Sequence, residues 1–329
     1  MKTTKVFISC LIACMLMGGC SKETGNKIDI IFDTDANNEL DDQHALAYLM
    51  LNDNTFNIVG ITVNATRNGG DITEHYKEAE RIITLCNRKG KVKLLEGANT
   101  SFEEIQNTLS DPHFDGYPAV DFIIEEARKY NSDNKLVLLA VGKLTNVALA
   151  LKKAPDITGK IRLVWLGSNY PEPGEYNLED DIPSMNYILN TDVHFEIVLV
   201  QYGKPSGTDA VRITKERVLA IMPGLGPKAE EAITGRHGGE FHNFGDYSVE
   251  LFEHIDYYDA TQSRALFDMA AVAIIKNPDW AQQREIPCPI MIDGVWVEQA
   301  DNARKITLWE NFNKEEIIDD FCQTLTSKN

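Results

Sequence analysis

The sequence has little cysteine, no excess of basic residues and no apolar run long enough for a membrane-spanning helix. Of its six cysteines, only Cys86, Cys288 and Cys322 follow residue 20. Three thiols so far apart form neither a disulfide framework nor a zinc-binding spacing, so we expect them to be buried small hydrophobic side chains. The net charge of −18 is spread along the chain. This charge argues against a nucleic-acid partner.

Residues 1–19 have the pattern of a secretory signal peptide: two lysines, the apolar run VFISCLIACMLM, then Gly18 and Gly19. The run is too short to cross a bilayer. Cys20, directly after the small pair, resembles a bacterial lipoprotein box. We therefore predict a lipid on Cys20 as the only membrane attachment, a polar tether over residues 20–27 and a location in the bacterial cell envelope. The alternative is a simple signal peptide with an incidental cysteine.

Residues 28–329 contain no linker, and they predict a single domain. Apolar strands and amphipathic helices alternate through the first half of this region. Such alternation is typical of an α/β fold with a mostly parallel central sheet flanked by helices, of the open, doubly wound kind. The strands are expected at residues 28–32, 56–63, 92–97, 136–141 and 161–167.

Four carboxylates stand between the first strand and the first helix. Asp33 and Asp35 end the strand, and Asp41 and Asp42 lie where an amphipathic helix begins. Ligand crevices of open α/β sheets lie at this end of the strands, and clustered oxygens are what calcium and magnesium require. The stretch therefore indicates a site for a hard cation.

Two other interpretations of this stretch remain open. One aspartate would cap the helix while the others are solvated loop charges. Alternatively, a strand that ends in Asp-x-Asp is typical of phosphatases with an aspartyl nucleophile, although Asn37 stands where those enzymes have Thr or Val.

Residues after the later strands are expected at the same edge of the sheet. Asn64 follows the second strand, where it lies near the acids or simply forms a turn. Gly142 follows the strand at 136–141, and a glycine there would let the Val141 carbonyl face a cation. Thr145 is expected to cap the next helix.

Three motifs together resemble the inosine-uridine-preferring nucleoside hydrolase family, whose members hydrolyse the N-glycosidic bond of ribonucleosides. They are DTDANNELDD, beginning at Asp33, VGKLTNVALAL, beginning at Val141, and FDMAAVAII, beginning at Phe267. The resemblance extends from about residue 28 to residue 323. In the first motif, the second and third acids are two residues farther apart than is usual in the family.

The resemblance implies a calcium site, because a crowded protein cage with two sugar hydroxyls and water exceeds the six ligands that magnesium prefers. Asp33 would support the cage from behind, and Asp35 would also be the general base. The implied calcium ligands are Asp35, Asp42, the Val141 carbonyl and Asp268. The implied ribose ligands are Asp41, Asn64, Asn177, Asn186 and Asp268.

Two departures from the family concern the substrate. Asn186 lies in MNYILNTDV, where the family has Glu-Phe-Asn, and Ser184 stands in place of the glutamate. Either the substrate differs at its 5′ end, or Glu175 or Glu179 fills the gap. Phe267 stands where the family has a histidine, so the proton for the leaving base would come from another residue.

The segment from Gly235 to Phe252 is rich in glycine, histidine and aromatics and resembles a mobile lid. Either its His237 or His242 would donate that proton, or its aromatic rings would stack on the base. We assign His242 as the candidate acid. Plain surface histidines are the alternative.

The predicted function is calcium-dependent hydrolysis of ribonucleosides, with a small-molecule substrate and possible homo-oligomers. The rival predictions are an aspartyl-nucleophile phosphatase and a lipoprotein that binds sugar or nucleoside with little or no turnover.

Overall fold

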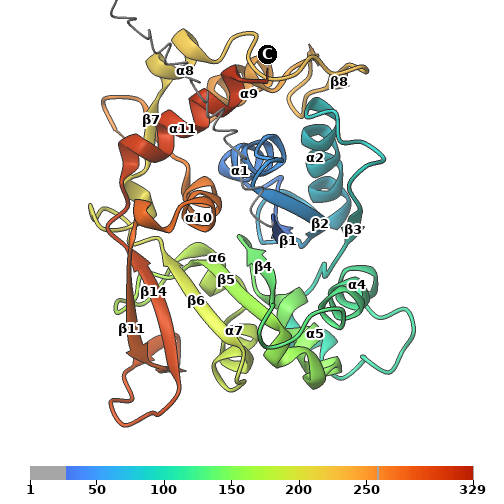
Figure 1. Cartoon of the computed structure of the whole chain (residues 1–329), viewed down its shortest axis with the longest axis vertical. Helices are drawn as coiled ribbons and strands as arrows, with labels where there is room; N and C mark the ends of the chain where they lie inside the picture. The colour runs from blue at the N-terminus through green and yellow to red at the C-terminus, as the bar shows by residue number, and fades with distance from the viewer. Residues whose placement is uncertain (1–26, 258, 329) are drawn as a thin grey trace, which may run out of the picture.

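The computed structural model describes residues 27–257 and 259–328. Its centre is an eight-stranded sheet with the strand order β11-β14-β6-β5-β4-β1-β2-β3 (Figure 1). All neighbours pair in parallel except β11 and β14, which are antiparallel. The strands are β1 Ile28–Thr34, β2 Phe56–Val63, β3 Leu94–Glu96, β4 Leu136–Ala140, β5 Ile161–Gly167, β6 His194–Leu199, β11 Gln282–Pro287 and β14 Lys305–Glu310.

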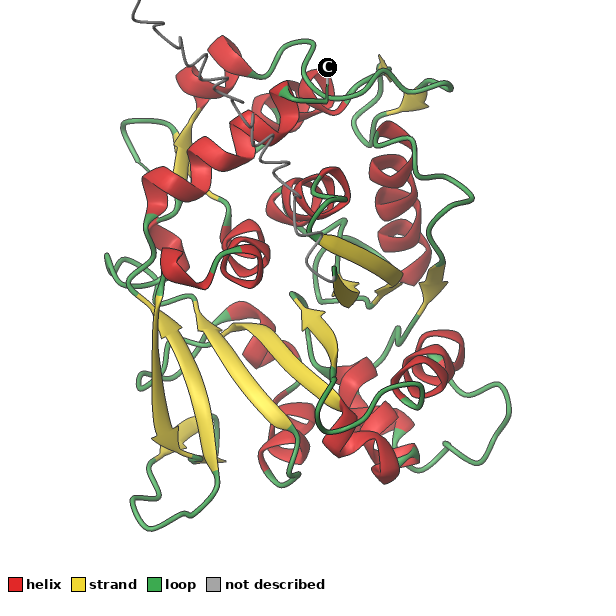
Figure 2. Ribbon diagram, viewed as in Figure 1, coloured by secondary structure: helices red, strands yellow, loops and turns green. Residues whose placement is uncertain are grey.

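Helices cover both faces of this sheet (Figure 2). One core contains Ile30 and Phe32 of β1, and the other contains Ile31 between them, as the two-residue period of a strand requires. The first core includes α1 Asp41–Leu51, α2 Ile72–Leu85, α8 Lys215–Ile221, α9 Phe244–Glu253, α10 Phe267–Lys276 and α11 Lys314–Thr326. The second includes α3 Phe102–Ile105, α4 Tyr117–Ala127, α5 Thr145–Lys153 and α7 Ile182–Leu189.

Short elements complete the described part of the chain. They are α6 Tyr176–Asp180, the 3₁₀ helices Pro155–Lys160, Thr208–Ala210 and Pro278–Trp280, and three two-stranded ribbons. The ribbons pair β7 Arg212–Thr214 with β10 Ser263–Ala265, β8 Ile233–Thr234 with β9 Glu240–Phe241, and β12 Ile290–Ile292 with β13 Val295–Val297.

The parallel register brings the functional segments to one edge of the sheet. Asp33 of β1 pairs with Thr62 of β2 and with Ala140 of β4, and Ala140 pairs with Trp165 of β5. The residues that follow these strands, among them Asp35 and Val141, therefore leave the sheet together. This edge is where ligand crevices of doubly wound sheets lie.

The predicted α/β fold is confirmed, and so is the burial of the three later cysteines, all of which are free. The prediction for Thr145 was wrong: Leu144 is the residue before α5, and no side chain caps that end. The Thr145 hydroxyl instead donates to the Asp181 carboxylate, which ties α5 to the start of α7. Within the described residues, no helix is both long and apolar enough to span a membrane. The predicted signal peptide and lipid site lie outside the described residues.

Candidate active site

A cavity of about 580 Å³ opens at the carboxyl edge of the sheet, next to the ends of β1, β4 and β5. Its lining combines carboxylates with three aromatic rings and two arginines. This volume is that of a small-molecule site. The charged and aromatic lining residues are Asp35, Glu39, Asp41, Asp42, Glu175, Asp209, Asp268, Tyr176, Tyr202, Phe267, Arg212 and Arg264.

Three of the carboxylates converge at the N-termini of two packed helices. Asp41 and Asp42 form the first turn of α1, as predicted, and Asp268 lies in the first turn of α10. One oxygen from each lies within 4.8 Å of the others, and all three residues are buried. The two segments that bring them together are more than two hundred residues apart in the sequence, so only the packing of α1 against α10 assembles the group.

In the part of the chain that the structure describes, these buried carboxylates have no compensating side-chain cation. Burial raises the pKa of Asp41 to about 7, and burial with mutual repulsion raises the pKa values of Asp42 and Asp268 well above their usual range. Among residues 27–257 and 259–328, no lysine or arginine lies within ion-pair distance of the three. Uncompensated carboxylates at this burial are costly, whereas a divalent cation with oxygen ligands neutralises them. The donor set therefore fits a hard cation such as calcium.

Asp35 lies in the cavity wall beside this group. Thr66 Oγ1 donates to Asp35 Oδ2 at 2.5 Å, and burial raises the pKa of Asp35 to about 6. A Cβ atom on Gly142 would approach Asp35 Oδ1 and Asn64 Oδ1 to 2.8 Å each. The sequence places glycine there because nothing larger fits between the β4 end and these two oxygens.

Asp33 and Asn64 form the layer beneath the cavity rather than its wall. The Asp33 carboxylate accepts hydrogen bonds from Thr62 at 2.6 Å, Asn146 at 2.7 Å and Asn64 at 2.5 Å. Burial nevertheless raises the pKa of Asp33 to about 6. Neither Asp33 nor Asn64 lines the cavity. Asn64 Oδ1 is buried without a hydrogen-bond partner in the described structure and lies beside Gly142.

The Val141 carbonyl and Asn177 line the cavity together. Asn177 Nδ2 donates to the Val141 carbonyl at 2.7 Å and to the Leu166 carbonyl at 3.2 Å. These two bonds fix the amide and leave Asn177 Oδ1 as its acceptor for a ligand. A carbonyl oxygen has two lone pairs, so Val141 retains one for a cation.

Glu175 is held in the cavity wall by backbone groups. Its carboxylate accepts from the amides of Ser168 at 2.9 Å, Asn177 at 3.0 Å and Leu178 at 3.0 Å. Its φ of 108° is a strained backbone conformation for a residue with a side chain. Burial raises its pKa to about 7. Of the two glutamates that the sequence offered for this position, Glu175 lines the cavity, whereas Glu179 is 56% exposed.

Asn186, Ser184 and His242 do not line the cavity. Asn186 lies in α7, where its carbonyl accepts from Asn190, and the Ser184 hydroxyl donates to the Asp181 carbonyl within the same turn. His242 is exposed just after β9. The cavity wall contains no histidine among the described residues, and Phe267 contacts Tyr202 there with ring centroids 5.9 Å apart.

The two extra residues of the first motif lie in the turn before α1, which hydrogen bonds of Asn37 hold in place. Asn37 N donates to His75 Nδ1 at 3.2 Å, and Asn37 Nδ2 donates to the Gly69 carbonyl at 2.7 Å. The turn ends at Leu40, and α1 still begins at Asp41. The longer spacing is therefore compatible with Asp41 and Asp42 at the helix start.

The sheet and the carboxylate-lined cavity at its carboxyl edge define an α/β protein with a small-molecule site fitted for a hard cation. Comparison with known families identifies it further. The model of the inosine-uridine preferring nucleoside hydrolase family matches residues 30–319, and the chain belongs to this family.

Solved structures of nucleoside hydrolases have a similar fold. A plant nucleoside hydrolase has a TM-score of 0.69 at 16% identity, with 92% of this chain and 100% of that one covered. A purine-preferring ribonucleoside hydrolase from Gardnerella vaginalis has a TM-score of 0.71 at 19% identity, with 91% and 98% covered. An uncharacterized protein of Schizosaccharomyces pombe is 30% identical over 142 residues, which span 38% of this chain and 45% of that protein.

The structure also identifies a motif that the sequence comparison missed. Glu175, Tyr176 and Asn177 are consecutive, line the cavity and have the order glutamate, aromatic, asparagine. This is the order of the family's Glu-Phe-Asn motif, which the resemblance predicts at residues 184–186. A search for that order within the loop from Ser168 to Ser184 would have found it.

Proposed function

We propose that this protein hydrolyses the N-glycosidic bond of ribonucleosides with the help of a bound calcium ion. The observation that carries the proposal is the buried group Asp41, Asp42 and Asp268, which opens with Asp35 into a cavity of nucleoside size. No side-chain cation of the described residues pairs with this group. Asp35, Asp42, Asp268 and the Val141 carbonyl would hold the ion. When bound, calcium polarises a water molecule and orients sugar hydroxyls.

Asp35 is the proposed general base. Thr66 holds its Oδ2, which leaves Oδ1, on the Gly142 side, to accept a proton from water. A base needs a pKa near the working pH, and in the calcium-free protein burial raises the pKa of Asp35 to about 6. Its position among fixed neighbours supplies orientation as well as basicity.

We propose sugar-binding groups on both sides of the cation site. Asp41 and Asp268 would accept hydroxyl protons, and Asn177 would offer Oδ1. Glu175 would take the place expected for Ser184, and Asn177 that of Asn186, because both line the cavity and Ser184 and Asn186 do not. These carboxylates also stabilise the positive charge that develops on the ribose ring as the base departs.

Tyr176, Tyr202 and Phe267 supply an aromatic part of the wall against which a nucleobase would stack. The names of the matched structures support a nucleoside substrate, since they include inosine-uridine, inosine-guanosine and purine-preferring enzymes. His242 remains a candidate acid only if residues 235–252 move toward the cavity.

The burial of Asp33 argues against the phosphatase alternative. It is the first acid of the Asp-x-Asp pair, is fully buried and accepts three side-chain hydrogen bonds, so an incoming phosphate has no access to it. Asp35 alone of that pair lines the cavity.

The test is a panel of ribonucleosides assayed for release of reducing sugar by chelator-treated protein with and without added calcium. We expect sugar release that requires calcium. We also expect it to fall about a hundredfold or more in Asp35→Ala when both proteins are saturated with calcium, with the calcium content measured on the same samples because Asp35 is also a proposed ligand. Calcium-dependent binding of nucleosides without sugar release would instead identify a binding protein. A covalent phosphoenzyme would identify a phosphatase.

A further inference from the structure

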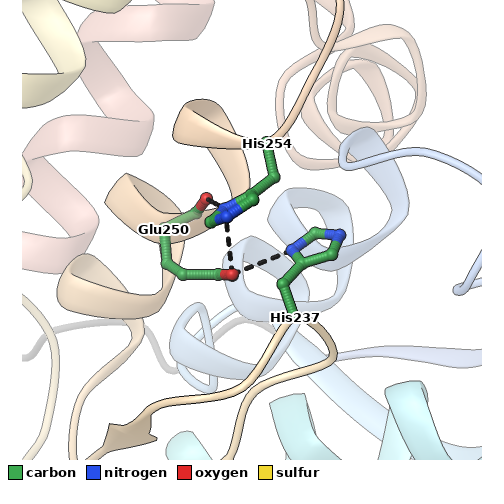
Figure 3. A group of neighbouring side chains, drawn as sticks. All are labelled: His237, Glu250 and His254. Atoms are coloured by element: carbon green, nitrogen blue, oxygen red, sulfur yellow. Dashed lines mark hydrogen bonds and ion pairs between the residues drawn. The ribbon is translucent and has the colours of Figure 1, made fainter.

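A second cluster of metal-binding side chains lies outside the cavity. It consists of His237, between β8 and β9, Glu250 of α9, and His254 at the end of α9 (Figure 3). His237 Nδ1 lies 2.8 Å from Glu250 Oε1, and His254 Nδ1 lies 3.1 Å from the same oxygen. Figure 3 shows the carboxylate facing both rings. None of the three residues lines the cavity.

Helix geometry and the hairpin together create this arrangement. Glu250 and His254 are four residues apart, so they lie on one side of α9. The turn between β8 and β9 contains Gly238 and Gly239, both with positive φ. This turn places His237 against the same side of α9. The two imidazole rings stack with centroids 4.5 Å apart. Metal ions bind the neutral form of imidazole.

The Glu250 carboxylate provides a second observation that points to a ligand. Its side chain is only 11% exposed, and Oε2 is buried with no hydrogen-bond partner among the described residues. Both histidines approach Oε1, and His254 Nδ1 also lies 2.9 Å from the Glu250 main-chain carbonyl, whereas Oε2 has no partner among the described residues. A metal ion bound by the carboxylate would correct this imbalance.

The ligand types select the metal. Two imidazole nitrogens and one carboxylate are a usual zinc set, with a fourth position left for water, and zinc binds such ligands at about 2.0–2.2 Å. Calcium and magnesium prefer oxygen ligands alone. The three ligand atoms lie within 4.8 Å of one another, so one ion can contact all of them after small side-chain adjustments.

We propose that His237, Glu250 and His254 bind one divalent transition-metal ion of the zinc class, which fastens the β8–β9 hairpin to α9. The histidine side chains are 29% and 48% exposed, so the ion has an open path from solvent. Binding displaces the ring protons that now point to Glu250. This site is independent of the proposed hydrolase activity.

Arg236 is a charged neighbour whose positive charge and hydrogen bond to His237 disfavour metal binding. Its Nε donates to His237 Nε2 at 3.3 Å, and its Nη1 contacts the carbonyls of Asn37 and Glu39. When His237 binds a metal through Nδ1, its remaining proton sits on Nε2, so the bond from Arg236 Nε must break. We therefore expect Arg236→Gln to retain or strengthen metal binding.

The experiment is a zinc titration by calorimetry on the full-length protein, which is first treated with chelator and then saturated with calcium so that the cavity carboxylates are occupied. We expect one zinc ion per chain and affinities at least about tenfold weaker in His237→Gln, Glu250→Gln and His254→Gln. His113→Gln is the matched control because His113 is exposed and lies outside the cluster. It should bind zinc like the wild type.

Two further measurements test whether the bound zinc is held by these side chains. X-ray absorption at the zinc edge should show imidazole scattering in the wild type that diminishes in His254→Gln, an exposed position where folding is not at risk. Zinc should also raise the melting temperature of the wild type, and not of His254→Gln, by on the order of a few degrees. Zinc affinity that none of the three ligand substitutions changes, or a purely oxygen-ligated spectrum, would overturn the proposal.

Discussion

Asp42 is the residue on which the proposed calcium site depends most directly. It lies in the first turn of α1, accepts a hydrogen bond from Thr34, and has a pKa raised by burial and by repulsion from Asp35 and Asp41. Asp42→Asn removes one charge from the cation site with almost no change of shape. We expect calcium affinity and hydrolysis to fall together, as calorimetry and a reducing-sugar assay on the same sample will show.

Asp209→Asn is the matched control for calcium affinity. Asp209 also lines the cavity, but its charge is already balanced by Arg212 at 2.6 Å. Its replacement should leave calcium affinity near the wild-type value. Wild-type affinity in Asp42→Asn would remove Asp42 from the site.

The presence of Phe267 in place of a histidine predicts that the rate of hydrolysis depends steeply on the leaving group. No histidine lines the described cavity, so a departing purine or pyrimidine has no fixed acid of that type. Such acid catalysis is typically worth about a hundred- to ten-thousandfold in rate. We therefore expect p-nitrophenyl riboside, whose leaving group needs no proton, to be cleaved far faster than inosine or uridine, as judged by kcat for each substrate.

Two variants separate the possible sources of the proton. Phe267→His should narrow the gap between the substrates, because it places an imidazole next to Asp268 at the cavity. If His242 reaches the base through a movement of residues 235–252, His242→Ala should slow inosine cleavage and spare the nitrophenyl substrate. Equal rates on both substrates in all three proteins would place the acid elsewhere.

Some of these residues could be predicted from the sequence, and others could not. The aspartates were visible because four acids follow directly on an apolar strand and precede a helix, which is a local pattern. Asn177 was found, but Asn186 was preferred for the Glu-Phe-Asn position because the boundary between α6 and α7 cannot be seen in a loop rich in acids and prolines. Phe267 and Tyr202 meet only through packing of distant segments, which sequence spacing does not report.

At the scale of elements, Glu196 links three neighbouring strands. From β6, it accepts hydrogen bonds from Arg162 of β5 at 2.6 Å and Trp309 of β14 at 2.7 Å, and His194 lies 3.1 Å away. Burial alone would raise the pKa of Glu196, but the bonds from His194, Arg162 and Trp309 outweigh it and hold the pKa at about 2.

The resulting prediction concerns stability. A carboxylate with a lowered pKa stabilises the fold above its unfolded pKa of about 4.5, and this contribution is lost as pH falls toward 2. The shift corresponds to roughly 3 kcal/mol. We expect Glu196→Gln to lower the free energy of unfolding at pH 7 by about this amount in urea titrations, with a smaller difference at lower pH.

Glu310→Gln provides the comparison for that experiment. Glu310 of β14 pairs with Arg284 of β11 at 3.1 Å, but the arginine is 48% exposed. An ion pair at the surface contributes about 0–1 kcal/mol. Similar losses in the two variants would mean that the burial of Glu196 does not matter.

The elements themselves were predicted unevenly along the chain. From β1 to β5 the strands alternate with helices and neighbour one another in the sheet, so local patterns were sufficient, apart from the shortness of β3. β14 instead inserts between β6 and β11, and β6 lies more than one hundred residues earlier. Pairing across such distances is decided by packing, and no strand beyond residue 167 was predicted.

At the scale of the whole molecule, we propose a lipid anchor on Cys20 in the bacterial envelope. The small pair before Cys20 and the polar residues after it support this proposal. Labelling of cells with a fatty-acid analogue should mark the wild-type protein and not Cys20→Ser, which should be released in soluble form. Equal labelling of the two proteins would contradict an anchor at this cysteine.

The carboxylates of the cavity also predict how the stability of the calcium-free protein depends on pH. Burial raises the pKa of Asp35 to about 6 and that of Asp41 to about 7, from 3.8 in both cases. Between pH 3.8 and these raised pKa values, the two carboxyl groups are protonated in the folded protein and ionised in the unfolded chain. The stability that these groups contribute is complete below about pH 4 and is lost as pH rises through 6 and 7.

Calcium should reverse this loss, because it binds the ionised carboxylates of the folded state and not the dispersed carboxylates of the unfolded chain. We therefore expect the melting temperature of chelated protein to fall between pH 5 and pH 8, and calcium to raise it more at pH 8 than at pH 5. Asp41→Asn removes the carboxylate with the pKa of about 7, so it should flatten the fall in the chelated protein. If calcium raised the melting temperature equally at both pH values, the ion would bind away from these carboxylates, because only binding to the ionised cluster couples its affinity to their protons.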